Sequence, residues 1–226
     1  MIDGVAFVPA SPVLIPEVAQ GAAHELDDLR AACRTAIRAA SNGAERIVLV
    51  GAGPSPRTYG PGARGSLAGF GVDLTVQLGT GEAGPVQLPP SLTVGAWLVR
   101  DALADPPPVT AHAFPGEPVF PRSFDPDPAG KAALVVVGDG SARRSTTAPG
   151  YFDPRAEGFD AAVAGALRDG RAADLAVDAA SAEELLIGGA TVWAAIAGEL
   201  GSRAWDARLL YDAAPYGVGY FVAVWT

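Results

Sequence analysis

Short apolar runs alternate along the chain with segments of helical periodicity. A run of β-branched residues bounded by glycine or proline is typical of a strand buried on both faces, whereas apolar residues three and four positions apart indicate a helix. On this basis we expect strands at 5–8, 46–50, 72–78, 109–114, 132–137, 207–211 and 219–225. We expect helices at 24–40, 92–103, 156–167, 172–177, 181–186 and 191–200, with Ser181 as the N-cap of the fifth.

Strands that alternate with helices indicate an α/β sheet covered by helices on both faces. The last two strands are close enough in sequence to form a hairpin, so the sheet should contain antiparallel pairs as well. We therefore predict a three-layer α/β/α fold with a mixed, mostly parallel central sheet. No segment resembles a linker, and we expect residues 1–226 to form a single domain. The proline-rich segment 115–128 is expected to run over the surface.

Composition narrows the class of protein. Hydrophobic residues make up 49% of the 226 residues, which is enough for one large core. The net charge of −9 argues against binding to nucleic acid or to an anionic membrane, because both need a basic face. Cys33 is the only cysteine, so an intrachain disulfide and a cysteine metal cluster are excluded. With no apolar run of membrane-spanning length and no signal-peptide pattern, we expect a cytoplasmic protein.

The loop after the apolar run 132–137 is the first candidate for a functional site. Ligands of open α/β sheets usually bind at the carboxyl ends of the strands. This loop would bring Asp139, Ser141, Arg143 and Arg144 to that edge. Asp139 could serve as a base and Arg143 could hold an anion, although an aspartate in a loop also readily accepts hydrogen bonds from the amides of its own loop.

Other motifs give weaker signals. The glycines at 51 and 53 begin a dinucleotide-binding pattern, but Pro56 stands where its third glycine would be. His24 and His112 are the only histidines, which is too few for a typical iron or zinc site and leaves Ser141 without an activating partner. A carboxylate-rich magnesium or calcium site stays open, with Asp139 as the acidic residue of the strand-end loops.

Four longer segments follow one another along nearly the whole chain. They are Phe7-Val-Pro-Ala-Ser-Pro-Val-Leu-Ile-Pro-Glu17, Val48-Leu-Val-Gly-Ala-Gly-Pro54, Val137-Gly-Asp-Gly-Ser-Ala-Arg-Arg144 and Pro215-Tyr-Gly-Val-Gly-Tyr-Phe-Val-Ala223. In this order and spacing they resemble the class III extradiol ring-cleavage dioxygenase superfamily, in particular its catalytic B-subunit type. The resemblance implies the three-layer fold and, in the family, an Fe(II) site built from two histidines and a glutamate, with a third histidine as acid/base.

The departures from the family pattern fall on its chemistry. The first histidine position matches Ala10, the second Gly53 (or Ala52 in a register shifted by one), and the third Ala142. Neither a methyl group nor a hydrogen atom can bind a metal or transfer a proton. The family glutamate matches Glu183, Glu184 or Leu186, depending on the register. The resemblance thus implies a degenerate site with no bound metal and no cofactor, although Fe(II) is the family's metal.

Three functions follow as hypotheses. The first is a protein that has lost Fe(II) binding and ring cleavage and is retained as a small-molecule or protein binding scaffold. The second is an enzyme with metal-independent chemistry in the same cleft, carried by Asp139, Ser141 and Arg143. The third is a dioxygenase with non-standard ligands such as His112. In all three, a homodimer is a reasonable expectation from the resemblance, and the expected cleft residues are Ala10, Ser11, Gly53, Ser55, Asp139, Ser141, Ala142, Arg143 and Tyr216.

Overall fold

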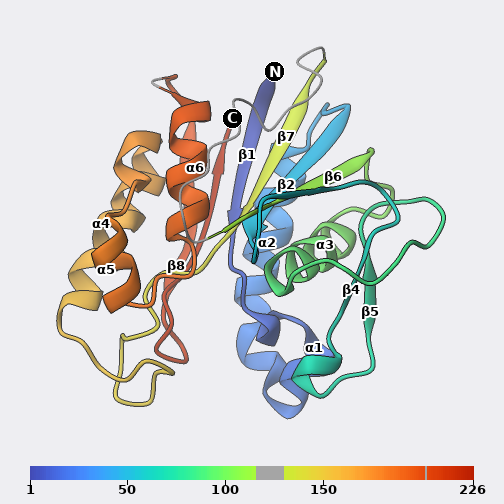
Figure 1. Ribbon diagram of the computed structural model, residues 1–226. Coiled ribbons are helices and arrows are strands. Elements are labelled where there is room, and N and C mark those ends of the chain that lie inside the picture. The colour runs from blue at the N-terminus through green and yellow to red at the C-terminus, as the bar shows by residue number, and fades with distance from the viewer. Residues whose placement is uncertain (116–129, 202) are drawn as a thin grey trace.

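A seven-stranded mixed sheet forms the centre of the computed structural model, which describes residues 1–115, 130–201 and 203–226 (Figure 1). Its order is β3-β6-β2-β7-β1-β9-β8, and β6, β2, β7 and β1 are parallel neighbours. Antiparallel strands β3 at one edge and β9 and β8 at the other complete the sheet. The predicted mixed α/β architecture and the final hairpin are confirmed. The strands are β1 Ile2–Val8, β2 Arg46–Ala52, β3 Arg57–Tyr59, β6 Val109–Phe114, β7 Ala132–Val137, β8 Ala207–Ala213 and β9 Tyr220–Trp225.

Helices lie against both faces of this sheet (Figure 1). Helices α2 (Asp27–Ala40) and α3 (Pro90–Ala102) cover one face, and α4 (Arg155–Asp169) and α6 (Ala190–Leu200) cover the other. Shorter helices are α1 Pro16–Ala19 and α5 Ala179–Glu184, with 3-10 turns at Pro12–Leu14, Gln20–Leu26, Ala68–Phe70 and Ala172–Leu175. Apart from Pro115, the proline-rich segment 115–128 lies outside the described residues.

The alternation of side chains along each central strand supplies two separate cores. In β7, Ala133, Val135 and Val137 pack against α2 and α3, whereas Leu134 and Val136 pack against α4 and α6. All six residues of β7 are buried. This explains why the strand is a continuous apolar run and not an alternating one.

Three local predictions were wrong. The predicted strand 72–78 shrinks to β5 (Thr75–Gln77), which pairs only with β4 (Arg64–Ser66) outside the central sheet. The alternation of apolar residues reflects burial of Val76 and Leu78 against α3. The preceding residues 72–74 form a turn and hydrogen-bond the backbone of Leu67, so they do not extend the strand. The fifth helix is capped by Asp178, whose carboxylate accepts the Ser181 N–H at 2.9 Å, so Ser181 lies inside the helix. The predicted helix 172–177 is only the 3-10 turn at 172–175.

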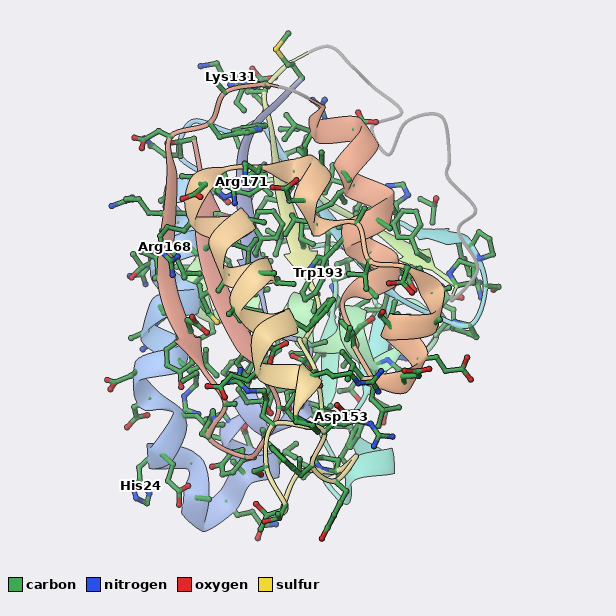
Figure 2. All side chains as sticks on the ribbon, turned by 90° about the vertical axis from the view of Figure 1, so that its left-hand side faces the viewer. His24, Lys131, Asp153, Arg168, Arg171 and Trp193 are labelled. Atoms are coloured by element: carbon green, nitrogen blue, oxygen red, sulfur yellow. The ribbon has the colours of Figure 1, made fainter. Side chains whose placement is uncertain are left out.

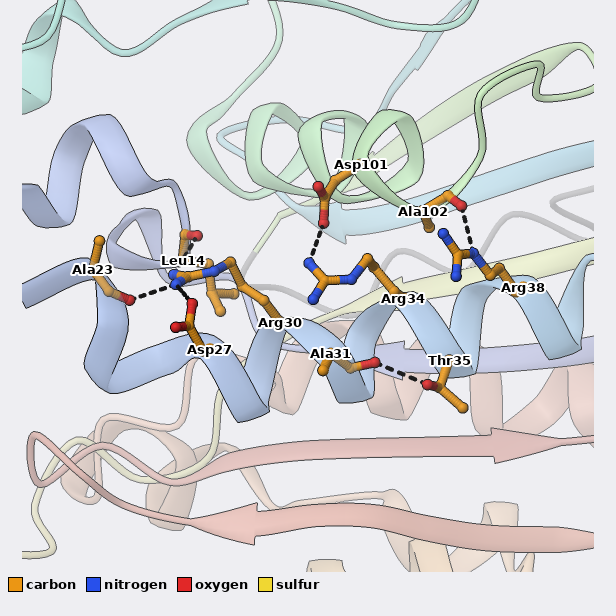
Figure 3. Close-up of polar contacts among 10 residues, drawn as sticks. All are labelled: Leu14, Ala23, Asp27, Arg30, Ala31, Arg34, Thr35, Arg38, Asp101 and Ala102. Carbon is orange, nitrogen blue, oxygen red and sulfur yellow. Dashed lines mark hydrogen bonds and ion pairs between the residues drawn. The ribbon is translucent and has the colours of Figure 1, made fainter.

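Arginines one turn apart on α2 connect it to its neighbours (Figure 3). Arg30 is buried and its guanidinium donates to the carbonyls of Leu14 and Ala23 and to Asp27. Arg34 pairs with Asp101 of α3 at 3.0 Å, and Arg38 donates to the Ala102 carbonyl at the end of α3. The hydrogen bond from Arg30 to the Leu14 carbonyl fixes the segment that follows β1. No helix among the described residues has the length and apolar character needed to cross a membrane.

We expect Arg30→Ala to lower the free energy of unfolding by about 2–4 kcal/mol, because it removes the donor that satisfies two carbonyls packed around a buried side chain. Urea denaturation followed by circular dichroism measures the change. The matched control is Arg34→Ala, whose half-exposed ion pair should contribute no more than about 1 kcal/mol. Equal losses for the two variants would contradict this assignment.

Candidate functional site

The loops that leave β1, β2 and β7 meet at one edge of the sheet, as the sequence predicted for parallel strands. Val8 and Gly51 both pair with Val137, so Ala10, Gly53 and Asp139 follow neighbouring strand ends. The contact between the first and third loops is direct, because the Ala10 N–H donates to Asp139 Oδ1 at 2.8 Å. In Figure 2 this end of the molecule carries Asp153 and lies opposite Lys131, which precedes β7.

Asp139 is a partly buried carboxyl with an altered acidity. The expectation that it caps its own loop is wrong, since the donor is the Ala10 amide, 129 residues earlier in the chain. Burial raises the pKa of Asp139 to about 7, against the smaller lowering effect of the Ala10 hydrogen bond. A carboxyl group whose pKa is raised in this way can donate or accept a proton closer to neutral pH than an ordinary aspartate can.

A second polar pair lies in the same region. The buried Tyr220 hydroxyl donates to Ser11 Oγ at 3.0 Å, joining β9 to the loop after β1. Burial raises the pKa of Tyr220 to about 12, and the charge of nearby Asp139 adds to this effect. Tyr220 was not among the cleft residues predicted from the sequence, because a tyrosine in an apolar strand is usually a residue of the hydrophobic core.

Ser141 is fully buried and its hydroxyl is engaged. It donates to the Leu185 carbonyl at 2.7 Å and accepts the Arg143 N–H at 3.2 Å. The hydroxyl thus joins the loop after β7 to the turn after α5. In this position Ser141 holds the loop and has no free hydroxyl for nucleophilic attack.

Beneath this loop lies Asp160 of α4, a carboxylate with no solvent exposure. It accepts the Ser141 N–H at 2.9 Å and pairs with Arg144 at 3.0 Å. Burial raises its pKa, and the Ser141 amide and Arg144 lower it. A sequence signal existed: Asp160 lies on the apolar stripe of α4 with Ala156 and Val163, where a charged residue is unexpected.

Arg143 forms no ion pair with a described residue, although its charge contributes to the lowered pKa of Asp153. Its Nε atom is buried without a hydrogen-bond acceptor, and no ion pair forms with its guanidinium in the described part of the chain. Leu186 lies near it, because a Cβ on Gly150 would meet both Leu186 Cδ1 and Arg143 Cγ, and Leu186 is 44% exposed. Tyr151 and Phe152, which follow Gly150 in the chain, are 66% and 50% exposed. Tyr151 and Leu186 also have left-handed backbone, with φ of 61° and 52°. Such strain in non-glycine residues persists where the surroundings impose it, often at binding sites.

The remaining predicted cleft residues are dispersed. Ser55 is exposed in the loop after β2. The Tyr216 hydroxyl donates to Glu25 at 2.9 Å, near the start of α2, and is thereby engaged outside the Asp139 region. Ala142 lies beside Gly150, whose N–H donates to the Ala142 carbonyl at 2.9 Å.

The residues at the family's metal positions do not fit Fe(II). A Cβ added to Gly53 would lie 2.7 Å from the Ala113 Cβ and 3.3 Å from Pro89 Cγ, so the space for a ligand side chain is filled. Ala10, and Ala52 in the shifted register, offer only methyl groups. Ala142, at the position of the acid/base histidine, likewise has no group that could transfer a proton. Among residues 1–115, 130–201 and 203–226 no group of three or more His, Cys, Asp or Glu is placed to hold a metal.

The side chains that could replace the missing metal ligands are engaged in other contacts or carry no donor atom. His112 Nδ1 contacts Thr58 Oγ1 at 3.1 Å between β6 and β3, and His24 bonds the Gly21 carbonyl in an exposed turn. Of the positions matched to the family glutamate, Glu183 is exposed, Glu184 pairs with Arg155 at 2.6 Å, and Leu186 has no donor atom.

We expect Asp139 to make the protein less stable as pH rises from about 4 to about 7. The folded state holds this proton more tightly than the unfolded chain, so the stabilisation present below the unfolded pKa is lost as pH passes the folded pKa. The loss should amount to about 3 kcal/mol, and Asp139→Asn should remove it. Urea denaturation across this pH range measures the slope.

Asp153→Asn is the control, because hydrogen bonds from Arg155 lower the pKa of Asp153 to about 2, below this window. That variant should keep the wild-type slope between about pH 4 and pH 7. If Asp139→Asn also keeps it, the raised pKa of Asp139 is refuted.

Comparisons with protein-family models and with curated proteins found no match to this chain.

Proposed function

We propose that this chain is a class III extradiol dioxygenase-like protein of three-layer α/β/α architecture that binds a small molecule without Fe(II) and does not cleave aromatic rings. The proposal is supported by the order of the four sequence segments and by the chemistry of the residues at the strand ends. The binding face we propose is the loop after β7 and the surface beside it, formed by Arg143, Tyr151, Phe152 and Leu186.

The absence of space for a side chain at Gly53 is the observation that supports a protein without bound iron. Interiors of proteins are close-packed, so a side chain enters such a position only if its neighbours move. Here the neighbours are Ala113 in β6 and Pro89 at the start of α3, both part of the core framework. A site retained for iron would need that volume open for an imidazole.

The ligand class follows from the side chains of the proposed face. An unpaired guanidinium favours a carboxylate or phosphate, which it can bind through two parallel hydrogen bonds. Exposed aromatic and aliphatic groups around it favour an apolar body attached to that anion. We therefore propose a small organic anion with an apolar portion as the ligand.

A second function is favoured by the environment of Asp139, a partly buried carboxyl group at the strand ends whose burial raises its pKa to about 7. A carboxyl group tuned to the operating pH is suited to general acid or base catalysis. In this alternative the chain is a metal-independent enzyme that moves a proton at Asp139 Oδ2, with Arg143 binding the substrate anion and Ser141 only supporting the loop.

Packing at Gly53 gives a direct test. We expect Gly53→Ala to lower the free energy of unfolding by about 1–3 kcal/mol through overpacking against Ala113. Adding Ala113→Gly should restore part of that loss, because the double substitution relieves the contact. Gly198→Ala, on an exposed helix position with nothing within 4 Å of the added Cβ, is the control and should be neutral or slightly stabilising. A neutral Gly53→Ala would show that the space is open.

Ligand binding tests the positive part of the proposal. Thermal shift with a panel of small carboxylates and phosphate esters should yield anions that raise the melting temperature of the wild-type protein. For these, Arg143→Gln should weaken binding by about tenfold, as expected for loss of a charge-assisted hydrogen bond. Arg208→Gln, which removes an exposed arginine of β8, should leave the affinity unchanged. A panel without hits, or hits that bind Arg143→Gln equally well, would contradict the proposal.

A further inference from the structure

A cavity of about 180 Å³ lies on the α3 side of the molecule, apart from the loop after β7. Its lining residues come from the second half of α3, the chain that leaves β5, the connection after α3 and the start of β6. Its walls are mostly apolar: Leu78, Ala96, Val99, Ala104, Pro106 and Val109.

Two small residues create this space. Ala96 lies on α3 where a larger side chain would fill the gap, one turn before Arg100 on the same helix face. Gly79 has a φ of +59°, a conformation that favours glycine, and so adds no side chain to the wall formed with Val109. The local backbone and the helix spacing thus leave an apolar hollow with one arginine beside it.

Arg100 is exposed and pairs with no residue in the described part of the chain. The two arginines that α2 directs at α3 differ in this respect, because Arg34 pairs with Asp101 and Arg38 donates to the Ala102 carbonyl (Figure 3). A guanidinium at the rim of an apolar cavity has its donors free for an anion.

We propose that this cavity binds a small apolar monocarboxylate, with its hydrocarbon part inside and its carboxylate on Arg100. An apolar cavity of about 150 Å³ accommodates benzene, so this one holds about six or seven carbon atoms. Burial of the hydrocarbon supplies affinity, and the arginine selects an acid over a neutral molecule of the same length. This site is independent of the proposed function at the loop after β7.

Nuclear magnetic resonance with hexanoate and 1-hexanol as probes tests the proposal. Both should shift the methyl resonances of Leu78, Val99 and Val109, with hexanoate binding more tightly. Arg100→Gln should weaken hexanoate binding about fivefold and leave hexanol unchanged, since only the acid uses the guanidinium.

Arg168→Gln is the matched control, because Arg168 is also an exposed arginine in the last turn of a helix and lies on α4 across the sheet (Figure 2). It should leave the binding of both probes unchanged. Ala104→Phe, a substitution at an exposed position of the rim, should block both probes. Absence of hexanoate shifts in these methyl groups, or equal weakening of hexanoate and hexanol by Arg100→Gln, would overturn the assignment.

Discussion

Burial of the Asp160 carboxylate is the constraint on which the loop after β7 depends. A carboxylate without solvent contact must be paired and hydrogen-bonded, and here Arg144 and the Ser141 amide do this. Its two oxygens also require close neighbours without side chains. A Cβ on Gly140 would lie 2.7 Å from Oδ1, and a Cβ on Gly219 would overlap Oδ2. One side chain of α4 thus joins the loop after β7 to the chain entering β9.

This constraint gives a structural reason for the Gly-Asp-Gly-Ser segment that needs no reaction. Gly138 allows close approach of Gly189, Asp139 holds the Ala10 amide, Gly140 leaves room for Asp160, and Ser141 bonds the Leu185 carbonyl. Each residue is therefore accounted for by packing or hydrogen bonding. Arg143, by contrast with Ser141, has a buried Nε donor without an acceptor among the described residues, which is why the proposed ligand face is centred on that side chain.

Sequence reasoning succeeded where one local pattern decides the structure. The limits of β6 and β7 match the predicted strands, because apolar runs bounded by proline and glycine leave little choice of conformation. It failed at 72–78, where a contact distant in sequence decides, because burial over α3 produced the alternation. It also failed at the start of α5, where two local caps compete: Asp178, three residues before the expected serine, caps the helix.

The candidate site divides in the same way. The meeting of Ala10, Gly53 and Asp139 at one edge follows from parallel strands, and it was predictable. The filling of the space at Gly53 was not, because Pro89 and Ala113 are far from it in sequence. Nor was the partner of Asp139, since no local pattern shows that its acceptor oxygen would reach a loop 129 residues earlier.

The central claim is that the strand-end site of this chain does not take Fe(II). The most direct measurement is the iron content of purified protein after anaerobic incubation with excess Fe(II) and removal of unbound metal. The account predicts far less than one iron per chain, with no change in melting temperature. One iron per chain, lost when Asp139 is replaced by asparagine, would contradict it.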